Sequence, residues 1–374
     1  MRHALSAVLF PGLLACATGA AADVPRVLAD IAPVQSLVAR VMQGVGTPDL
    51  LIPPGVSAHD MALRPSQARA LSRADLVVWV GPEMSPWLGR ALEAIEGRDM
   101  VLLRVPGTQL YDMRDEALFA GLAEDHAGHV EGHDDQHDHG ADDDHDAHGV
   151  DDGHDDHGAD DDHDAGDSHD AHGADDGHDD HGADDGRDAH AHGGHDHAHD
   201  GTDPHAWLDP LNAATWMGAL AETLATLDPD HAALYRENAA QGAGELAALS
   251  ASIEARLAPA RATGLIAFHD AFQYFEARYG LTMVGSITPA DDSDPGPARI
   301  SALRDATRDG AVACAFSEPQ FNPGLLQAVT EEAGLPVAIL DPLGSDLDPG
   351  PDLYPTLLGQ LADAVVACVG DDAG

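Results

Sequence analysis

Four side chains that can bind a metal ion lie in loops at the ends of predicted secondary-structure elements. They are His59, His205, His269 and Asp341. In open α/β sheets, ligands bind outside the carboxyl ends of the strands, so loops of this kind meet at one site. Three imidazoles and one carboxylate form a four-donor set that suits tetrahedral Zn²⁺. The sequence therefore predicts a metal site built from these four residues.

Each histidine has a simpler explanation when it is taken alone. A single loop histidine is more often held by a local hydrogen bond than by a metal, and His231, inside a long predicted helix, is expected to be a solvated surface residue. Taken together, on a chain that also carries a histidine-rich segment, the other three histidines favour the metal site.

The charge of the chain excludes several classes of partner. Its 374 residues include 66 acidic and 18 basic side chains, for a net charge of −48, and every basic residue is an arginine. A surface that binds nucleic acid or anionic lipid needs clustered lysine and arginine, so we expect neither partner. The excess of carboxylates favours cations instead.

Much of this charge lies in residues 126–200, which hold 19 of the 24 histidines and almost no apolar side chains. Such a segment cannot offset its ordering entropy by burial, so we expect it to be a disordered insert. Its histidines occur in His-x-His and His-x-x-His pairs, which let a flexible chain bring two imidazoles to one ion. The predicted auxiliary metal-binding residues are His137, His139, His145, His148, His154, His157, His178, His181, His190, His192, His195, His197 and His199. The alternative is a solvated acidic spacer, which leaves the histidines unexplained.

The first 22 residues are typical of an export signal. An apolar run over 4–14 precedes the small residues at 20–22, and 11 apolar residues are too few to span a bilayer. We therefore expect a soluble, exported protein that begins near Asp23. In the alternative, the run at 13–16 is a lipoprotein cleavage box and Cys16 carries a lipid anchor.

Without Cys16, two cysteines remain in the exported chain. An even count in an oxidising compartment favours a disulfide between Cys314 and Cys368, and two separately buried thiols are the alternative.

Short apolar runs alternate with helical patterns on both sides of the insert, which is the signature of βαβ units on parallel sheets. A helical pattern over 230–257 separates two such regions, although Gly242 and Gly244 weaken it. We predict an α/β fold of two lobes joined by a long connector helix. The predicted segments are a signal peptide (1–22), an N-terminal lobe that includes the insert (23–228), the connector (229–258) and a C-terminal lobe (259–374).

Several motifs of this pattern resemble one family, and they are spread over the whole mature chain. They are Gly55–Asp60 followed by Leu63–Ser66, Ala74–Met84, Asp203–Pro210, Phe268–Ala271, Ser317–Phe321 and Leu340–Gly344. The sequence resembles the ZnuA-type periplasmic zinc-binding components of bacterial ABC zinc importers, within the cluster A-I metal-binding proteins.

The resemblance implies that His59, His205 and His269 are metal ligands, and that Asp341 matches a carboxylate that is a ligand in some members. Some zinc members have a glutamate before the first histidine, but this chain has Ala58, so the fourth donor is expected to be Asp341 or water. The family also implies a disulfide in the C-terminal lobe at the positions of the two cysteines.

For function, the resemblance implies zinc capture in the periplasm by a monomer, delivery to an ABC permease in the inner membrane, and no catalysis. The insert takes the place of a shorter histidine loop in the family, with the role of an auxiliary zinc collector or sensor. The rivals are a receptor of the same class for Mn²⁺ or Fe²⁺, an adhesin that uses this fold, and a zinc hydrolase. The last is disfavoured because the chain has no His-Glu-x-x-His motif.

Overall fold

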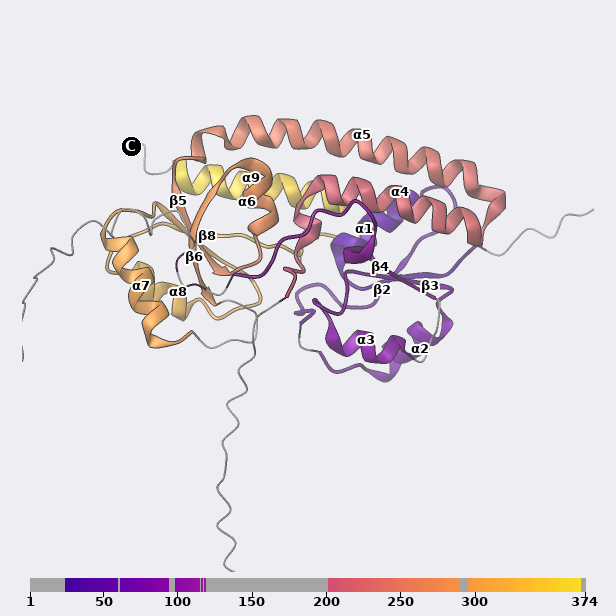
Figure 1. Ribbon diagram of the computed structural model, residues 1–374, viewed down its shortest axis with the longest axis horizontal. Helices are drawn as coiled ribbons and strands as arrows, with labels where there is room; N and C mark the ends of the chain where they lie inside the picture. Colours follow the sequence, from indigo (N-terminus) through magenta and orange to yellow (C-terminus); the bar gives the residue numbers. More distant parts are fainter. Residues whose placement is uncertain are drawn as a thin grey trace, which may run out of the picture. The chain divides into compact units, whose positions relative to one another are not determined.

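Two four-stranded parallel β-sheets, each with helices against its faces, form the framework of the computed structural model (Figure 1). The structure describes residues 24–59, 61–93, 98–114, 116, 118, 201–288 and 295–370. The predicted signal peptide, with Cys16, and the predicted insert lie outside these residues. The predicted fold class, two βα lobes with parallel sheets and a long connector helix, is confirmed.

The N-terminal sheet has the strand order β2-β1-β3-β4, and all of its pairs are parallel. Its strands are β1 (Val27–Ala29), β2 (Asp49–Leu50), β3 (Leu76–Trp79) and β4 (Asp99–Val101). The helices between and after them are α1 (Ala32–Val41), α2 (Pro65–Arg73), α3 (Pro86–Leu92) and α4 (Pro210–Leu227). The two central strands, β1 and β3, are buried along their whole length, as expected of a parallel sheet covered on both faces.

The C-terminal sheet has the matching order β6-β5-β7-β8 and is also fully parallel. Its strands are β5 (Gly264–His269), β6 (Thr282–Thr288), β7 (Cys314–Ser317) and β8 (Val337–Ile339). Its helices are α6 (Gln273–Tyr279), α7 (Pro297–Arg308), α8 (Gly324–Thr330) and α9 (Leu353–Gly370). In each sheet the second strand in chain order (β2 or β6) pairs on one side of the first (β1 or β5), and the third strand (β3 or β7) pairs on its other side.

The connector between the two sheets is α5 (Ala232–Leu257), an unbroken helix of 26 residues and about 39 Å. Gly242 does not interrupt it. A Cβ atom at this position would lie 3.0 Å from Sδ of Met217 on α4 and 3.3 Å from Cγ of Arg40 on α1. The glycine therefore allows α1 and α4 to approach the middle of the connector closely.

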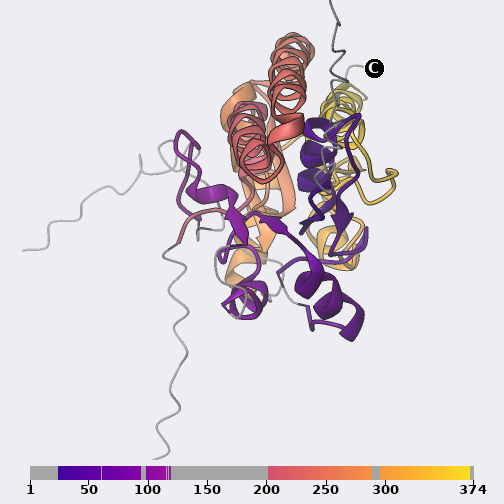
Figure 2. The same cartoon turned by 90° about the vertical axis from the view of Figure 1, so that its right-hand side faces the viewer.

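The last helix, α9, packs on α5 and also on α1 of the N-terminal lobe (Figures 1 and 2). Its apolar side chains Leu357, Leu361 and Val365 are buried in a core that continues from one sheet to the other. Among the described residues it is the one helix long and apolar enough to cross a membrane. Its packing identifies it as a core helix, because a buried core helix can have the same length and hydropathy as a membrane-spanning one.

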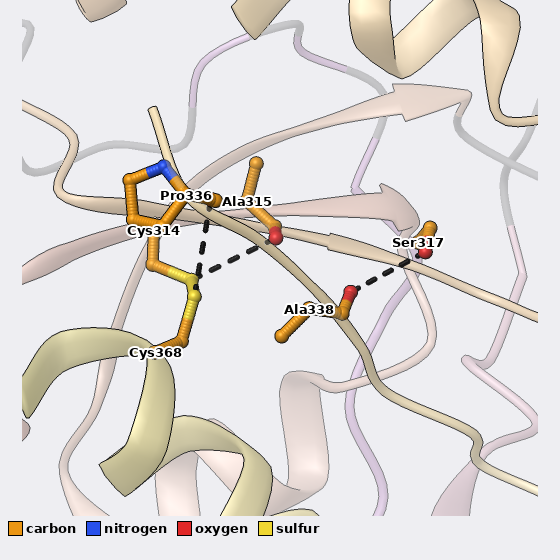
Figure 3. Close-up of a disulfide and its surroundings, with 6 residues drawn as sticks. All are labelled: Cys314, Ala315, Ser317, Pro336, Ala338 and Cys368. Atoms are coloured by element: carbon orange, nitrogen blue, oxygen red, sulfur yellow. Dashed lines mark hydrogen bonds between the residues drawn. A yellow bond between two sulfur atoms is a disulfide. The ribbon is translucent and has the colours of Figure 1, made fainter. Parts of the chain in front are cut away.

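A disulfide joins Cys314 on β7 to Cys368 near the end of α9, with the two Cα atoms 6.0 Å apart (Figure 3). It closes a loop across 54 positions, so α9 is tied covalently to the C-terminal sheet while its other contacts reach the N-terminal lobe. The predicted disulfide is confirmed.

One predicted strand differs in the structure. The sequence favours a strand over 101–105, but pairing starts at Asp99 and the chain then turns into a 3-10 helix, Leu102–Arg104. The start is earlier because β4 is an edge strand, where a polar residue such as Asp99 is tolerated and here accepts a hydrogen bond from Nε1 of Trp79 at 3.0 Å. The other short 3-10 segments are Ala206–Leu208, Pro229–His231 and Ala258–Ala260.

Asp30, directly after β1, gives the fold a testable pH dependence. Its carboxylate accepts hydrogen bonds from the amides of Ile31 (2.7 Å) and Val80 (2.8 Å), but complete burial raises its pKa from 3.8 to about 7. The folded state therefore binds this proton more tightly than the unfolded state, and the stabilisation is lost as the pH rises toward 7.

We expect this group to lower the free energy of unfolding of metal-free protein by about 2 kcal/mol between pH 5.5 and pH 8. Asp30→Asn removes the contribution, so its stability should fall less over that interval in urea titrations at both pH values. Asp49→Asn, at an exposed position on β2, is the control. An unchanged pH dependence in Asp30→Asn would show that burial does not raise this pKa.

Candidate metal centre

His59, His205 and His269 come together in the structure, although they lie far apart in the sequence. Each contributes one ring nitrogen to a group whose atoms all lie within 4.8 Å of one another. His205 and His269 are almost completely buried, at 4% and 3% exposed, and His59 is half-buried. The first two residues of the cluster come from the N-terminal part of the fold and the third comes from the end of β5 in the C-terminal sheet.

A buried carboxylate fixes the ring of His205. Oδ1 of Asp203 accepts hydrogen bonds from both the backbone amide of His205 (2.9 Å) and its Nδ1 (2.7 Å). Burial raises the pKa of Asp203 to about 7, against the lowering effect of the amide hydrogen bond and of nearby Arg114. With its proton on Nδ1, His205 presents a lone pair at Nε2, the form in which imidazole binds a metal.

Glu318 fixes the ring of His269 in the way that Asp203 fixes that of His205. Its Oε1 accepts from Nδ1 of His269 at 2.6 Å, and both side chains are buried. The sheet register explains this contact, because β5 and β7 are paired with Ile266 opposite Ala315. Three residues further along each strand, His269 lies beside Glu318. With its proton on Nδ1, His269 therefore also presents the lone pair of Nε2.

The two acceptor nitrogens face each other with the separation that a shared ion requires. Nε2 of His269 and Nε2 of His205 are 3.3 Å apart. Two nitrogen ligands at about 2.0–2.1 Å from a tetrahedral Zn²⁺ lie about 3.3–3.4 Å from each other. Two facing lone pairs repel, and a cation between them removes the repulsion. The geometry of this pair thus fits zinc.

His59 is positioned by the carbonyl group of the residue before it. The oxygen of Ala58 accepts hydrogen bonds from Oγ of Ser85 and from Nε1 of Trp87, both at 2.9 Å, at the start of α3. The amide of His59 donates to Oγ of Ser57 at 3.2 Å. These contacts hold the loop after β2 so that the His59 ring lies 5.5 Å from that of His205, centroid to centroid.

The three rings line a small cavity. Its wall also includes Met84, Trp207, Gln320, Phe321 and Leu343.

Asp341, the fourth predicted ligand, is not in this group. Its Oδ1 accepts from the amide of Leu343 at 2.9 Å, and its Oδ2 accepts from the amide and hydroxyl of Ser345, both at 2.6 Å. Its role as a ligand stays a prediction. The auxiliary histidines at 137–199 lie outside the described residues.

The supporting residues were not predicted as part of the site, although signals for them exist. Asp203 lies two positions before His205, and Glu318 follows the end of β7 just as the histidine at 269 ends β5. The strand-end rule that selects His269 as a candidate therefore also selects Glu318, once the two strands are known to be neighbours.

Arg114 links the chain on one side of the insert to the C-terminal lobe. Its guanidinium pairs with Asp270, and with Glu276 at 2.8 Å. The segments on the two sides of the insert are also joined to each other: the amide of Met113 donates to the carbonyl of Gly201, and the amide of Asp203 donates to the carbonyl of Tyr111, both at 2.9 Å. Burial raises the pKa of Asp270 and of Glu276, and Arg114 opposes that effect. This cluster holds the segment that precedes His205.

Replacing Arg114 by methionine should lower the free energy of unfolding by about 3 kcal/mol, because the buried carboxylate of Asp270 and the half-buried carboxylate of Glu276 lose the cation that they face. Urea denaturation of metal-free protein measures this change. Arg236→Met removes an exposed pair with Glu222 and should change the stability far less. Equal losses in the two variants would contradict the structural role of Arg114.

The fold and the histidine cluster together are those of a two-lobed metal-binding protein, with two parallel sheets, one connector helix and three histidines gathered from both lobes. Residues 27–368 match the family model described as "ZnuA: Zinc-uptake complex component A periplasmic". The chain belongs to the ZnuA family, as its motifs indicated.

Relatives and solved structures agree with this assignment. The chain is 40% identical to the high-affinity zinc uptake system protein ZnuA of Paracoccus denitrificans, over 98% of each protein. A crystal structure of a ZnuA deletion mutant with zinc bound shares the fold, with a TM-score of 0.62, 20% identity and coverage of 92% of this chain and 98% of that one. The structure of FpvC from Pseudomonas aeruginosa in complex with Mn²⁺ also shares the fold, with a TM-score of 0.64 and 19% identity. The match covers 94% of this chain and 100% of the FpvC chain.

Proposed function

We propose that this protein captures zinc in the periplasm and delivers it to an ABC permease. The observation that carries the proposal is the pair of buried imidazoles whose Nε2 atoms lie 3.3 Å apart, each with its Nδ1 bound to a buried carboxylate. Membership of the ZnuA family supports the same function. The 40% identical relative is named for high-affinity zinc uptake.

In this proposal His59, His205 and His269 bind the ion through neutral imidazoles, and a water molecule fills the fourth position. The carboxylate of Asp341 is engaged by three hydrogen bonds in this conformation, which favours water over Asp341 among the two predicted donors. A site of imidazoles suits zinc better than Mn²⁺, which prefers carboxylate and water oxygens. The fold alone does not decide the metal, since the structure of FpvC with Mn²⁺ shares it.

The remaining parts of the proposal concern the path of the ion. The signal at 1–22 exports the chain, and the monomer binds zinc and docks on the permease, which opens the site to release it. The histidines of residues 126–200 collect zinc near the site, because tethering raises the local concentration of donors. Flexible donors are not preorganised, so these sites bind zinc more weakly than the three-histidine cluster.

Competition calorimetry tests the metal and the role of the insert. The full chain and a variant without residues 126–200 are titrated with Zn²⁺ in the presence and absence of excess Mn²⁺. We expect one tight zinc site in both proteins, insensitive to Mn²⁺, and additional weaker zinc sites in the full chain alone. Displacement of zinc from the tight site by Mn²⁺ would favour a manganese receptor. Identical stoichiometry in the two proteins would refute the collecting role of the insert.

A further inference from the structure

A tight turn after β7 brings a side chain with no assigned role to the histidine cluster. The amide of Phe321 donates to the carbonyl of Glu318 across this turn, at 3.2 Å. The ring of Phe321 stacks on Phe268, with centroids 4.5 Å apart and planes within 8°. The turn is thus held at both ends, and Gln320, inside it, lines the cavity with the three histidines.

The side-chain amide of Gln320 is buried without a hydrogen bond. Its Oε1 and its Nε2 are both inaccessible to solvent, and neither has a partner among the described residues. Burying an amide in this way costs free energy, so native proteins rarely leave one unpaired unless an ion, a water molecule or a ligand completes it. The position of this amide therefore points to something that enters the cavity.

Two other polar side chains on the cavity wall make hydrogen bonds within the site. Oε1 of Glu318 accepts from His269, and Oγ of Ser57 accepts from the amide of His59. The rest of the wall is apolar apart from the three imidazoles and backbone atoms. Gln320 is a neutral polar side chain on this wall, and its buried amide has no hydrogen-bond partner among the described residues, so it can bind a fourth, non-protein ligand of the ion.

We propose that Gln320 positions the water molecule that completes the zinc coordination. This inference rests on the proposed three-histidine zinc site. A zinc ion with three protein ligands keeps its fourth position for water, and that water donates two hydrogen bonds. Oε1 of Gln320 accepts one of them.

Two properties of Gln320→Met test this role. Methionine keeps the length of the side chain but accepts no strong hydrogen bond, so zinc affinity should fall about 10–100-fold, as when a residue that supports a metal ligand is removed. The metal-free variant should also melt about 2–4 °C higher than the wild type, because a buried unpaired amide is gone. A purely structural role predicts a lower melting temperature and unchanged affinity.

Zinc binding is measured on the full chain by fluorescence in chelator-buffered zinc. The chain has four tryptophans, and none of them lies in residues 126–200, while Trp207 lines the cavity. The signal therefore reports on the lobes and not on the insert. Gln327→Met, at an exposed position of α8 in the same lobe, is the matched control and should change neither property. Gln320→Glu keeps an acceptor and should bind zinc at least as tightly as the wild type.

The outcomes separate this inference from the proposed function. Weaker binding in Gln320→Met with retained binding in Gln320→Glu supports the role of Gln320. Wild-type affinity in Gln320→Met, or equal losses in both variants, overturns it and leaves the three-histidine site intact. If the wild type itself shows no tight zinc binding, the proposed function fails and the inference falls with it.

Discussion

His205→Ala should weaken zinc binding at the tight site by about 100–1000-fold. Structural zinc sites bind with an apparent free energy of about 10–16 kcal/mol at pH 7, shared among four ligands, so one ligand accounts for roughly 3–4 kcal/mol. His205 is the central residue of the cluster, since its ring lies 5.5 Å from that of His59 and 5.2 Å from that of His269. Fluorescence titration in chelator-buffered zinc measures the affinity.

His231→Ala is the control for this variant. His231 is the fourth histidine of the described lobes, and its Nδ1 lies 2.7 Å from Oδ2 of Asp228, away from the cluster. Its removal should leave zinc affinity within about threefold of the wild type, in agreement with its predicted surface position. If His205→Ala changed the affinity as little as His231→Ala, the cluster would not be the tight site.

Zinc affinity should fall about 1000-fold between pH 7.5 and pH 5.5. Only the neutral imidazole binds a metal, and a free imidazole has a pKa of about 6.5, so each of three ligands contributes about tenfold over this interval. Zinc binding therefore weakens as the pH falls. Burial raises the pKa of Asp203 to about 7, so this carboxylate also takes up a proton in the same interval and becomes a weaker acceptor for Nδ1 of His205.

The pH dependence of zinc affinity counts the imidazoles that bind the ion. The logarithm of the dissociation constant is plotted against pH, and a slope approaching three per unit on the acid side is expected. Circular dichroism of metal-free protein over the same range provides the control, because the lobes must stay folded. A slope of one or less would mean that carboxylates, and not three histidines, hold the metal.

The sequence predicts the frame of the site because its signals are local. Alternating apolar runs and helical patterns define both sheets, and strand ends place the loops of His59 and His269 at sheet edges. The structure brings these two side chains and His205 together. As zinc ligands they remain a prediction. The predicted domain boundaries and the auxiliary histidines at 137–199 also stay predictions.

The parts that sequence patterns miss depend on which distant segments become neighbours. Glu318 reaches the histidine at the end of β5 only because β7 pairs with that strand, and no local pattern contains this register. The side chain of Asp341 accepts hydrogen bonds within its own loop, one of them from the amide of Ser345, which a strand-end rule cannot foresee. No sequence pattern marks Gln320 as a functional residue. Its role is suggested only by the burial of its unpaired side-chain amide in the structure.

The most direct measurement is native mass spectrometry of the chain without residues 126–200, with and without His205→Ala, from solutions in which a chelator holds free zinc low. Deleting the insert removes 19 histidines, so any zinc that remains must be bound by the lobes. We predict one zinc ion on the parent and none on the variant. A parent without zinc, or a variant that still carries one ion, would contradict a zinc site made by His59, His205 and His269.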